Sequence, residues 1–282
     1  MLQIAIPIGL GAAIGFCIGL TGVGGGVLVL PALAVVLGFK ATLAVGTATA
    51  FSALSKIFAT WEHQRLGNVD HYIAGSMLAG AVPTVVTVAL YVKSQAQIPG
   101  FQYILGWVIT GAIALAAVLM AVRALYPPKN AQEPGKDANS AQSRPEDPDN
   151  PAPIASFGRF SPLAAGFGVI VGALIAATSV GGGVIIMPML VFGFAMRMRR
   201  VIGTAIVVSL VLSVVTSMVY HFAGPASEVD LSAASWMFVG SLLGIRAGSR
   251  LTTRWTDRAL LWASIVMIAA AVVAMTGRML TV

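Results

Sequence analysis

Two related glycine runs are the residues of this chain whose types and spacing could do chemistry. The first occupies residues 21–27 and reads TGVGGGV, and the second occupies residues 178–184 and reads TSVGGGV. Glycine permits positive φ and lets a ligand approach the backbone closely, and a helix that starts after such a turn presents unpaired N–H groups. Two helix N-termini that face one cavity predict a binding site for an anion.

Hydroxyl groups on the helices that follow the runs are expected to complete this site. Two alternatives stay open: the glycines only permit close helix crossing, as expected for Gly11, Gly15 and Gly19, and the hydroxyls only join helices. The predicted substrate-binding residues are Thr21, Gly22, Gly24, Gly25, Gly26, Thr47, Ser52, Thr178, Ser179, Gly181, Gly182, Gly183, Thr204 and Ser209.

One lysine and two histidines are further candidates. Lys56 is placed to attract an anion from the cytoplasmic end, and His63 and His221 are placed to relay protons. The alternatives are snorkelling of the lysine to the interface and ordinary solvated histidines. Three histidines, one cysteine and peripheral carboxylates assemble no catalytic or metal-binding group, so we expect no enzyme, no metal and no cofactor.

The distribution of acidic residues favours an anion over a cation as the substrate. All ten carboxylates fall in predicted loops or at the ends of apolar segments. Cation carriers commonly place an acidic side chain within the membrane, which disfavours Na⁺ or a metal ion here. Backbone N–H groups and hydroxyls suit an oxyanion better.

The elements that must position these residues are predicted to be membrane-spanning helices. The chain is 57% hydrophobic and 10% charged, with a mean hydropathy of +0.89, whereas soluble proteins average about 25% charged residues. About 20 apolar residues span a bilayer as a helix, and the ten-residue alternation of a membrane barrel is absent. We therefore expect an all-α polytopic membrane protein.

The chain is expected to contain two related halves joined by a flexible linker. At an offset of 157 residues, the twelve positions 22–33 share seven identities with positions 179–190, and after an insertion of three residues Val69-Asp70 matches Val229-Asp230. Residues rich in Pro, Asp, Asn and Ser separate the halves. The predicted division is an N-terminal transmembrane repeat (1–125), a cytoplasmic linker (126–160) and a C-terminal transmembrane repeat (161–282).

The charge distribution predicts that the repeats have inverted topology. The first uncharged run of 36 residues would extend about 54 Å as one helix, beyond the roughly 30 Å of the hydrocarbon core. If each glycine-broken segment enters and returns, as a re-entrant hairpin or two short tilted helices, 14 of the 17 basic residues face one side; a single crossing divides them 9 to 8. The positive-inside rule favours the first topology, with both termini extracytoplasmic and three further helices in each repeat.

The paired runs, with Pro31 and Pro188 after them, resemble the sulfite exporter TauE/SafE family. The resemblance covers nearly the whole chain and is specific for the family but weak for the substrate. It implies passage of sulfur-containing oxyanions, such as sulfite or sulfoacetate, across the bacterial inner membrane. The second run departs from the first because Ser179 stands where the first has Gly22.

These observations together predict a secondary transporter that moves a small sulfur-containing oxyanion by alternating access, with H⁺ as a candidate coupling ion. The alternative is a passive anion channel, because the same two helix termini could form a selectivity filter. The net charge of +7 is assigned to orientation in the lipid bilayer and not to nucleic-acid binding.

Overall fold

Every secondary-structure element in the described part of the chain is helical. The computed structural model describes residues 2–21, 26–65, 67–125, 161–180, 185–194, 198–223, 226–252 and 257–281. The all-α class is confirmed; the predicted linker lies outside the described residues. The helices are α1 (Leu2–Thr21), α2 (Gly26–Val36), α3 (Ala41–Arg65), α4 (His71–Ser94), α5 (Pro99–Leu125), α6 (Pro162–Thr178), α7 (Ile186–Phe194), α8 (Met198–Phe222), α9 (Leu231–Thr252) and α10 (Asp257–Thr281).

Local capping explains where several helices begin and end. Asp70 precedes α4, and its carboxylate accepts hydrogen bonds from the backbone N–H groups of Tyr72 and Ile73 at 3.1 and 3.0 Å. Ser161 caps α6 in the same way, with Pro162 as the first helical residue. Both patterns satisfy donors that a helix N-terminus leaves unpaired.

Several helices have the length and composition of membrane spans. By these criteria, residues 71–94 and 200–222 of the described chain each form a candidate span, and residues 41–65 form a third if its 40° bend is counted within one span. The shorter apolar helices are Ala5–Ile18, Gly100–Leu115, Pro162–Thr178 and Val266–Arg278.

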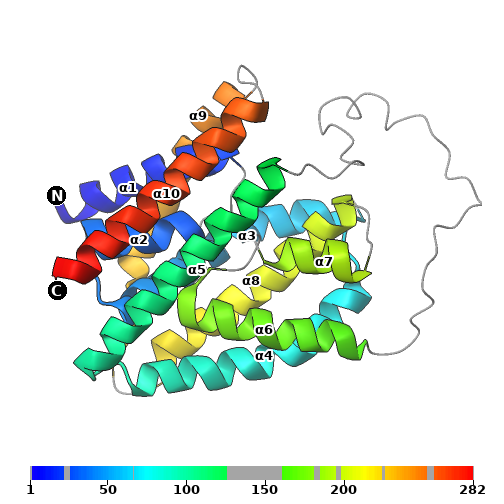
Figure 1. Cartoon of the computed structure of the whole chain (residues 1–282), viewed down its shortest axis with the longest axis horizontal. Helices are drawn as coiled ribbons and strands as arrows, with labels where there is room; N and C mark the ends of the chain where they lie inside the picture. Colours follow the sequence, from blue (N-terminus) through cyan, green and yellow to red (C-terminus); the bar gives the residue numbers. More distant parts are fainter. Residues whose placement is uncertain are drawn as a thin grey trace, which may run out of the picture.

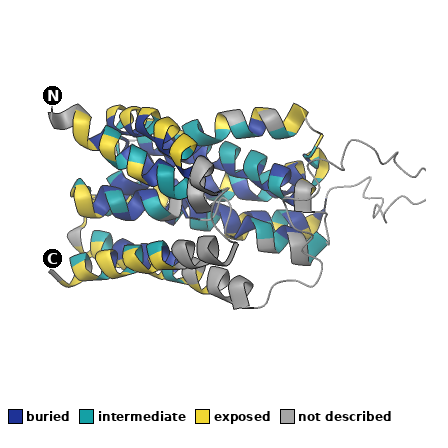
Figure 2. Ribbon diagram, turned by 90° about the horizontal axis from the view of Figure 1, so that it is seen from above, coloured by how far each residue is buried: buried dark blue, intermediate teal, exposed yellow. Residues whose placement is uncertain are grey.

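The helices pair across the two halves of the sequence. The first helix, α1, packs along α9, α6 packs along α4, and α3 packs against α8 in the interior. α5 packs against α10. In Figures 1 and 2, α1 begins and α10 ends at the same end of the molecule. In each of these pairs, a helix from the first half of the sequence therefore packs against a helix from the second half.

Glycines let these helix pairs approach until their backbones touch. A Cβ atom added at Gly11 or Gly15 of α1 would collide with the backbone carbonyls of Met237 or Ser241 in α9. Likewise, a Cβ at Gly168 or Gly172 of α6 would collide with the carbonyls of Met77 or Ala81 in α4. The predicted role of Gly11 and Gly15 in close helix crossing is confirmed, and Gly168 and Gly172, for which it was not predicted, have the same role.

The two contact sets consist of corresponding residues. Gly168 and Gly172 each lie 157 positions after Gly11 and Gly15, and the two residues that they meet on α4 lie 160 positions before those on α9. The sequence repeat has the same two offsets, 157 residues before the three-residue insertion and 160 residues after it.

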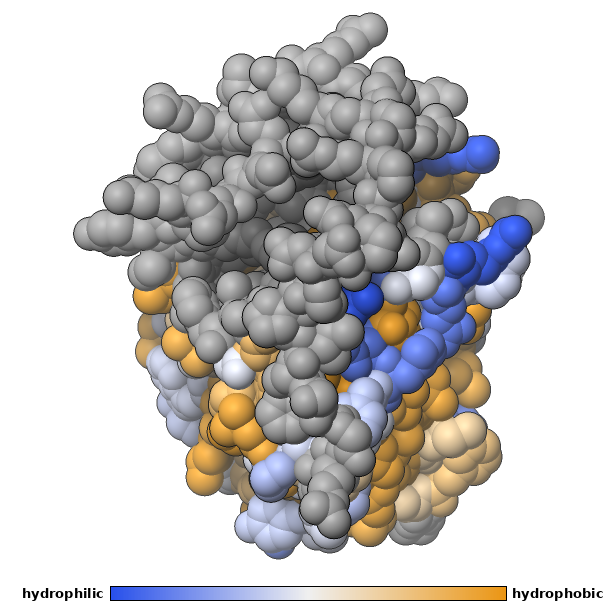
Figure 3. Space-filling view, turned by 90° about the vertical axis from the view of Figure 1, so that its right-hand side faces the viewer, coloured by the Kyte–Doolittle hydropathy of each residue, from blue (hydrophilic) through white to orange (hydrophobic). Residues whose placement is uncertain are grey.

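The core lies where the central helices meet. Phe51 of α3, Leu212 of α8 and Leu33 of α2 are fully buried, and buried residues occupy the interior in Figure 2. Figure 3 faces the right-hand end of Figure 1, where hydrophilic residues gather beside apolar flanks. The exposed Gln64 and Arg65 belong to this end of α3.

Candidate functional site

Described helices lie on either side of both glycine runs. α1 ends at Thr21 and α2 begins at Gly26, while α6 ends at Thr178 and α7 begins at Ile186. Of the predicted site, Gly22, Gly24, Gly25, Gly181, Gly182 and Gly183 lie outside the described residues.

Ser179 stands at the start of the second break and carries a buried hydroxyl. Its backbone has a left-handed φ of 54°, and its N–H donates to the carbonyl of Ile175 at 2.8 Å, which closes α6. The side chain is 7% exposed, and its Oγ finds no hydrogen-bond partner within the described chain. A buried hydroxyl without a hydrogen-bond partner lowers stability by about 1–3 kcal/mol.

Ser52 of α3 has the same property. It is 3% exposed, and its Oγ also lacks a partner among the residues that the structure describes. The corresponding residue of the other half, Ser209, donates to the carbonyl of Ile206 in its own helix at 3.2 Å. The two predicted serines are therefore not equivalent.

Three of the four predicted threonines are engaged in structural hydrogen bonds, and the side chain of the fourth, Thr21, lies outside the described part of the chain. Thr204 Oγ1 accepts from the backbone N–H of Asp70, and Thr47 Oγ1 accepts from that of Asp230, both at 3.0 Å. Thr178 Oγ1 donates to the carbonyl of Leu174 at 2.6 Å. The first two bonds join each central helix to the start of α4 or α9, which favours the structural alternative for Thr47 and Thr204.

Lys56 meets its own counterpart from the other half. Its Nζ lies 3.4 Å from Ser213 Oγ, and the two residues are 157 positions apart, which is the repeat offset. Lys56 is half-buried. The contact joins α3 to α8 in the interior and brings a cation to their interface.

The two histidines lie at opposite ends of the molecule. His63, near the end of α3, has a buried Nδ1 for which the described residues supply no partner. His221, at the end of α8, has its Nδ1 2.8 Å from Ser227 Oγ. The structure does not bring these side chains together, and it groups no three His, Cys, Asp or Glu residues into a metal site among the residues searched.

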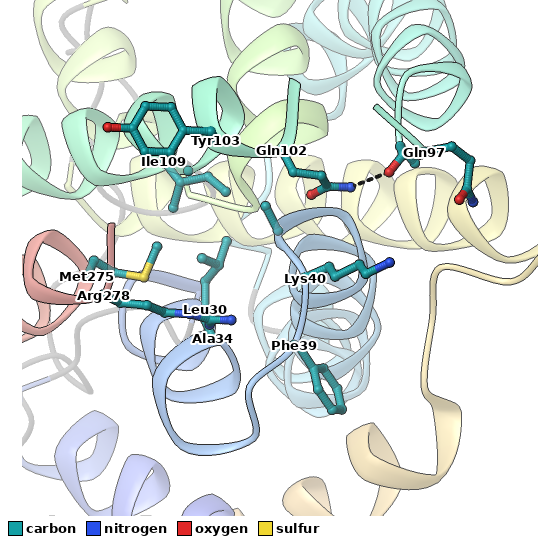
Figure 4. A pocket seen from close by; sticks show the side chains of 13 residues that line it. Leu30, Ala34, Phe39, Lys40, Gln97, Gln102, Tyr103, Ile109, Met275 and Arg278 are labelled. Atoms are coloured by element: carbon teal, nitrogen blue, oxygen red, sulfur yellow. Dashed lines mark hydrogen bonds between the residues drawn. The ribbon is translucent and has the colours of Figure 1, made fainter. Parts of the chain in front are cut away.

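Sequence reasoning missed a cavity of about 280 Å³ between α2, α5 and α10. Figure 4 shows its principal side chains, with Arg278 beside Leu30 and Ala34. From the sequence we expected only that few basic residues, Lys40 and Arg278 among them, lie on the extracytoplasmic side. The cavity is lined by Leu30, Ala34, Phe39, Lys40, Ala41, Ala96, Gln97, Gln102, Tyr103, Gly106, Ile109, Met275 and Arg278.

Comparison with known proteins identifies the family of the chain. The family model described as Sulfite exporter TauE/SafE matches residues 7–275. The chain is similar to the probable membrane transporter protein YjnA of Bacillus subtilis (strain 168), with 26% identity over 270 residues that cover 92% of this chain and 95% of the relative. No solved structure matches the chain.

Proposed function

Because the chain belongs to the sulfite exporter TauE/SafE family of membrane transporters, we propose that it is a secondary transporter of a sulfur-containing oxyanion across the bacterial inner membrane. The substrate is sulfite or a small organosulfonate such as sulfoacetate. The observation that carries the proposal is the pair of buried hydroxyls without partners, on Ser52 and Ser179, one of which adjoins a glycine break.

The proposed anion site consists of donors only. Sulfonate and sulfite oxygens accept hydrogen bonds, and the N-termini of α2 and α7 present N–H groups that their own helices leave unpaired. Ser52 and Ser179 add hydroxyl donors, and Lys56 adds positive charge. Of the described acidic residues, Asp70, Glu228 and Asp230 lie in the segments that precede α4 and α9, Asp257 is the first residue of α10, and Glu62 lies in the last turn of α3.

Reciprocal contacts support an inverted arrangement of the two halves. The bond from Asp70 N–H to Thr204 is repeated by the bond from Asp230 N–H to Thr47. If a two-fold axis relates the halves, a residue that touches its own counterpart lies at that axis, and Lys56 and Ser213 are such a pair. An axis in the membrane plane would put this lysine near mid-depth, where many transporters bind their substrates.

The same symmetry supports alternating access. If each half adopts the conformation of the other, the central site opens in turn to either side. The positive-inside rule orients both termini extracytoplasmically and the 126–160 segment toward the cytoplasm.

Flux through reconstituted protein tests the proposal and its alternative. Proteoliposomes loaded with unlabelled sulfoacetate or sulfite are expected to accumulate external radiolabelled anion transiently, because a carrier exchanges substrate one molecule at a time. Accumulation should saturate with concentration and respond to an imposed pH gradient if H⁺ is the coupling ion. Flux that neither saturates nor shows counterflow would instead indicate the passive channel.

A further inference from the structure

One face of α3 carries most of the buried polar atoms that lack a hydrogen-bond partner. In the described part of the chain, four buried side-chain atoms have no partner, and three of them are Ser52 Oγ, Thr60 Oγ1 and His63 Nδ1. Lys56 lies between Ser52 and Thr60 in the sequence. With about 3.6 residues per turn, the four positions fall within an arc of about 80° around the helix. These four residues are the polar face of α3.

The polar face points into the protein, and the opposite face of the helix points out. Ser52 and Thr60 are 3% and 8% exposed, whereas Ile57 and Trp61 on the other side are 49% and 55% exposed. Thr60 and Trp61 both follow the 40° bend of α3, so the two faces continue past it. Polar residues of membrane-spanning helices face the interior in this way where they serve a substrate or ion pathway.

The corresponding positions of α8 are satisfied by hydrogen bonds. The counterparts of the first and last residues of the polar face, 157 positions later, are Ser209 and Tyr220. Ser209 donates to the carbonyl of Ile206 at 3.2 Å, and the fully buried Tyr220 donates its hydroxyl to the carbonyl of Ala176 at 3.0 Å. The repeated fold therefore does not require unpartnered polar atoms at these positions.

The polar face is long enough to connect the middle of the membrane with its surface. Ser52 and His63 are eleven residues apart, which is about 16 Å along a helix, and half of the hydrocarbon core measures roughly 15 Å. The two hydroxyls and the ammonium group of Lys56 can all donate to an oxyanion, and none of the four residues is acidic. A row of unpartnered donors is costly unless a ligand completes its hydrogen bonds.

We propose that the polar face of α3 is the route by which the substrate anion passes between the cytoplasm and the central site. The anion exchanges one donor for the next, from His63 through Thr60 to Lys56 and Ser52. Because Thr60 and Ser52 are buried in this structure, the route opens when the two halves rearrange. The inference rests on the proposed function for its direction, since the positive-inside rule places the end of α3 on the cytoplasmic side.

Thiol labelling from each side of the membrane tests the route. The full chain carries Cys17→Ser, which removes the only cysteine of the sequence, together with Thr60→Cys, in inside-out and right-side-out vesicles. From the cytoplasmic side, a sulfonate-bearing methanethiosulfonate reagent should modify position 60 at least about tenfold faster than the trimethylammonium analogue, because positive charge concentrates anions locally. Each rate is first divided by the rate of that reagent with a free thiol. Lys56→Gln should remove the preference.

Two other positions on α3 serve as controls. Gln64→Cys, at an exposed position in the last turn, should react with both reagents from the cytoplasmic side. Ile57→Cys, on the opposite face, should react with neither. Three results at position 60 would overturn the proposal: no reaction where Gln64→Cys reacts, equal normalised rates for the two reagents, or reaction from the extracytoplasmic side alone.

Flux through a variant without a new cysteine gives a second test. Thr60→Val keeps the side-chain shape and removes the unpartnered hydroxyl. It should raise the KM for sulfonate entering from the cytoplasmic side about tenfold, the loss of one hydrogen bond to a charged ligand, without lowering the unfolding temperature. Thr110→Val is the matched control, because its hydroxyl donates to the carbonyl of Gly106 at 2.8 Å. A native KM in Thr60→Val would contradict the proposal.

The route and the proposed function can fail separately. Anion-selective labelling at position 60 that depends on Lys56, in a protein that moves no sulfonate, would support an anion route and reject sulfonate as its cargo. Normal sulfonate flux with labelling that ignores both reagent charge and Lys56 would reject the route alone.

Discussion

At the scale of single residues, two buried hydroxyls distinguish the proposed site from ordinary helix packing. Ser55 and Thr216, by contrast, donate to carbonyls in their own helices at 2.7 Å. Ser52 and Ser179 are buried without such a bond among the described residues. A polar group kept at this cost is explained if a ligand completes its hydrogen bonds.

Removal of these hydroxyls should affect transport more than stability. Ser52→Ala, and Ser179→Gly, which restores the glycine found at the matching position of the first run, are expected to raise the KM for flux about tenfold. The unfolding temperature should stay constant or rise, since each change removes an unsatisfied polar atom and Ser179→Gly also relieves a positive φ of 54°.

Ser55→Ala is the matched control, because its hydroxyl is satisfied within α3. KM values that remain at the native level in both site variants would remove Ser52 and Ser179 from the site.

Residue types predicted which groups were candidates but not how each would be used. Thr47 and Ser52 both follow the first break on one helix, yet the first hydroxyl accepts a bond from Asp230 and the second has no described partner. That difference depends on α9, whose start is far away in the sequence. No local pattern contains it.

At the scale of helices, close glycine contacts hold the molecule together. α6 supplies a contrast within one helix: a Cβ atom at Gly172 would lie 2.6 Å from the carbonyl oxygen of Ala81, whereas a Cβ at Gly166 would meet nothing within 4 Å. The first position has no room for a side chain and the second has.

Gly172→Leu should therefore destabilise the protein, and Gly166→Leu should not. Overpacking typically costs about 1–3 kcal/mol, and a backbone contact leaves little room for relaxation. Thermal unfolding in detergent, followed by tryptophan fluorescence, measures the difference. Similar unfolding temperatures for the two variants would show that α4 and α6 separate without cost.

The helical class and the two breaks were predictable, because apolar composition and consecutive glycines are local signals. The pairing of α1 with α9 was not predicted. Glycines spaced by four indicate a crossing but do not identify the partner helix.

At the scale of the whole molecule, the contact between Lys56 and Ser213 makes the proposed symmetry testable. Lys56→Ser should lower flux at least about tenfold, because it removes the described cation nearest the proposed axis. Adding Ser213→Lys should restore much of the flux, since a residue on the axis can be supplied by either half. A double variant no more active than Lys56→Ser would show that the two positions are not interchangeable.

The cavity between α2, α5 and α10 shows why a feature built from distant parts of the chain could not be predicted from the sequence. Its walls come from α2 and α5 of the first half and α10 of the second. Arg278 and Lys40 are far apart in the chain, and their placement in one cavity depends on the packing of α10 against α2 and α5.

The exchange of helices between halves has a consequence for biogenesis. α1 leaves the ribosome early, but α9 begins 210 residues after α1 ends, at Leu231. At translation rates of about 5–20 residues per second, the glycine face of α1 waits roughly 10–40 s for its partner. Until α9 is synthesised, the glycine face of α1 must therefore contact lipid or the translocation machinery. A chain that terminates before α9 would leave this face without its partner helix, and quality-control proteases could recognise such a product.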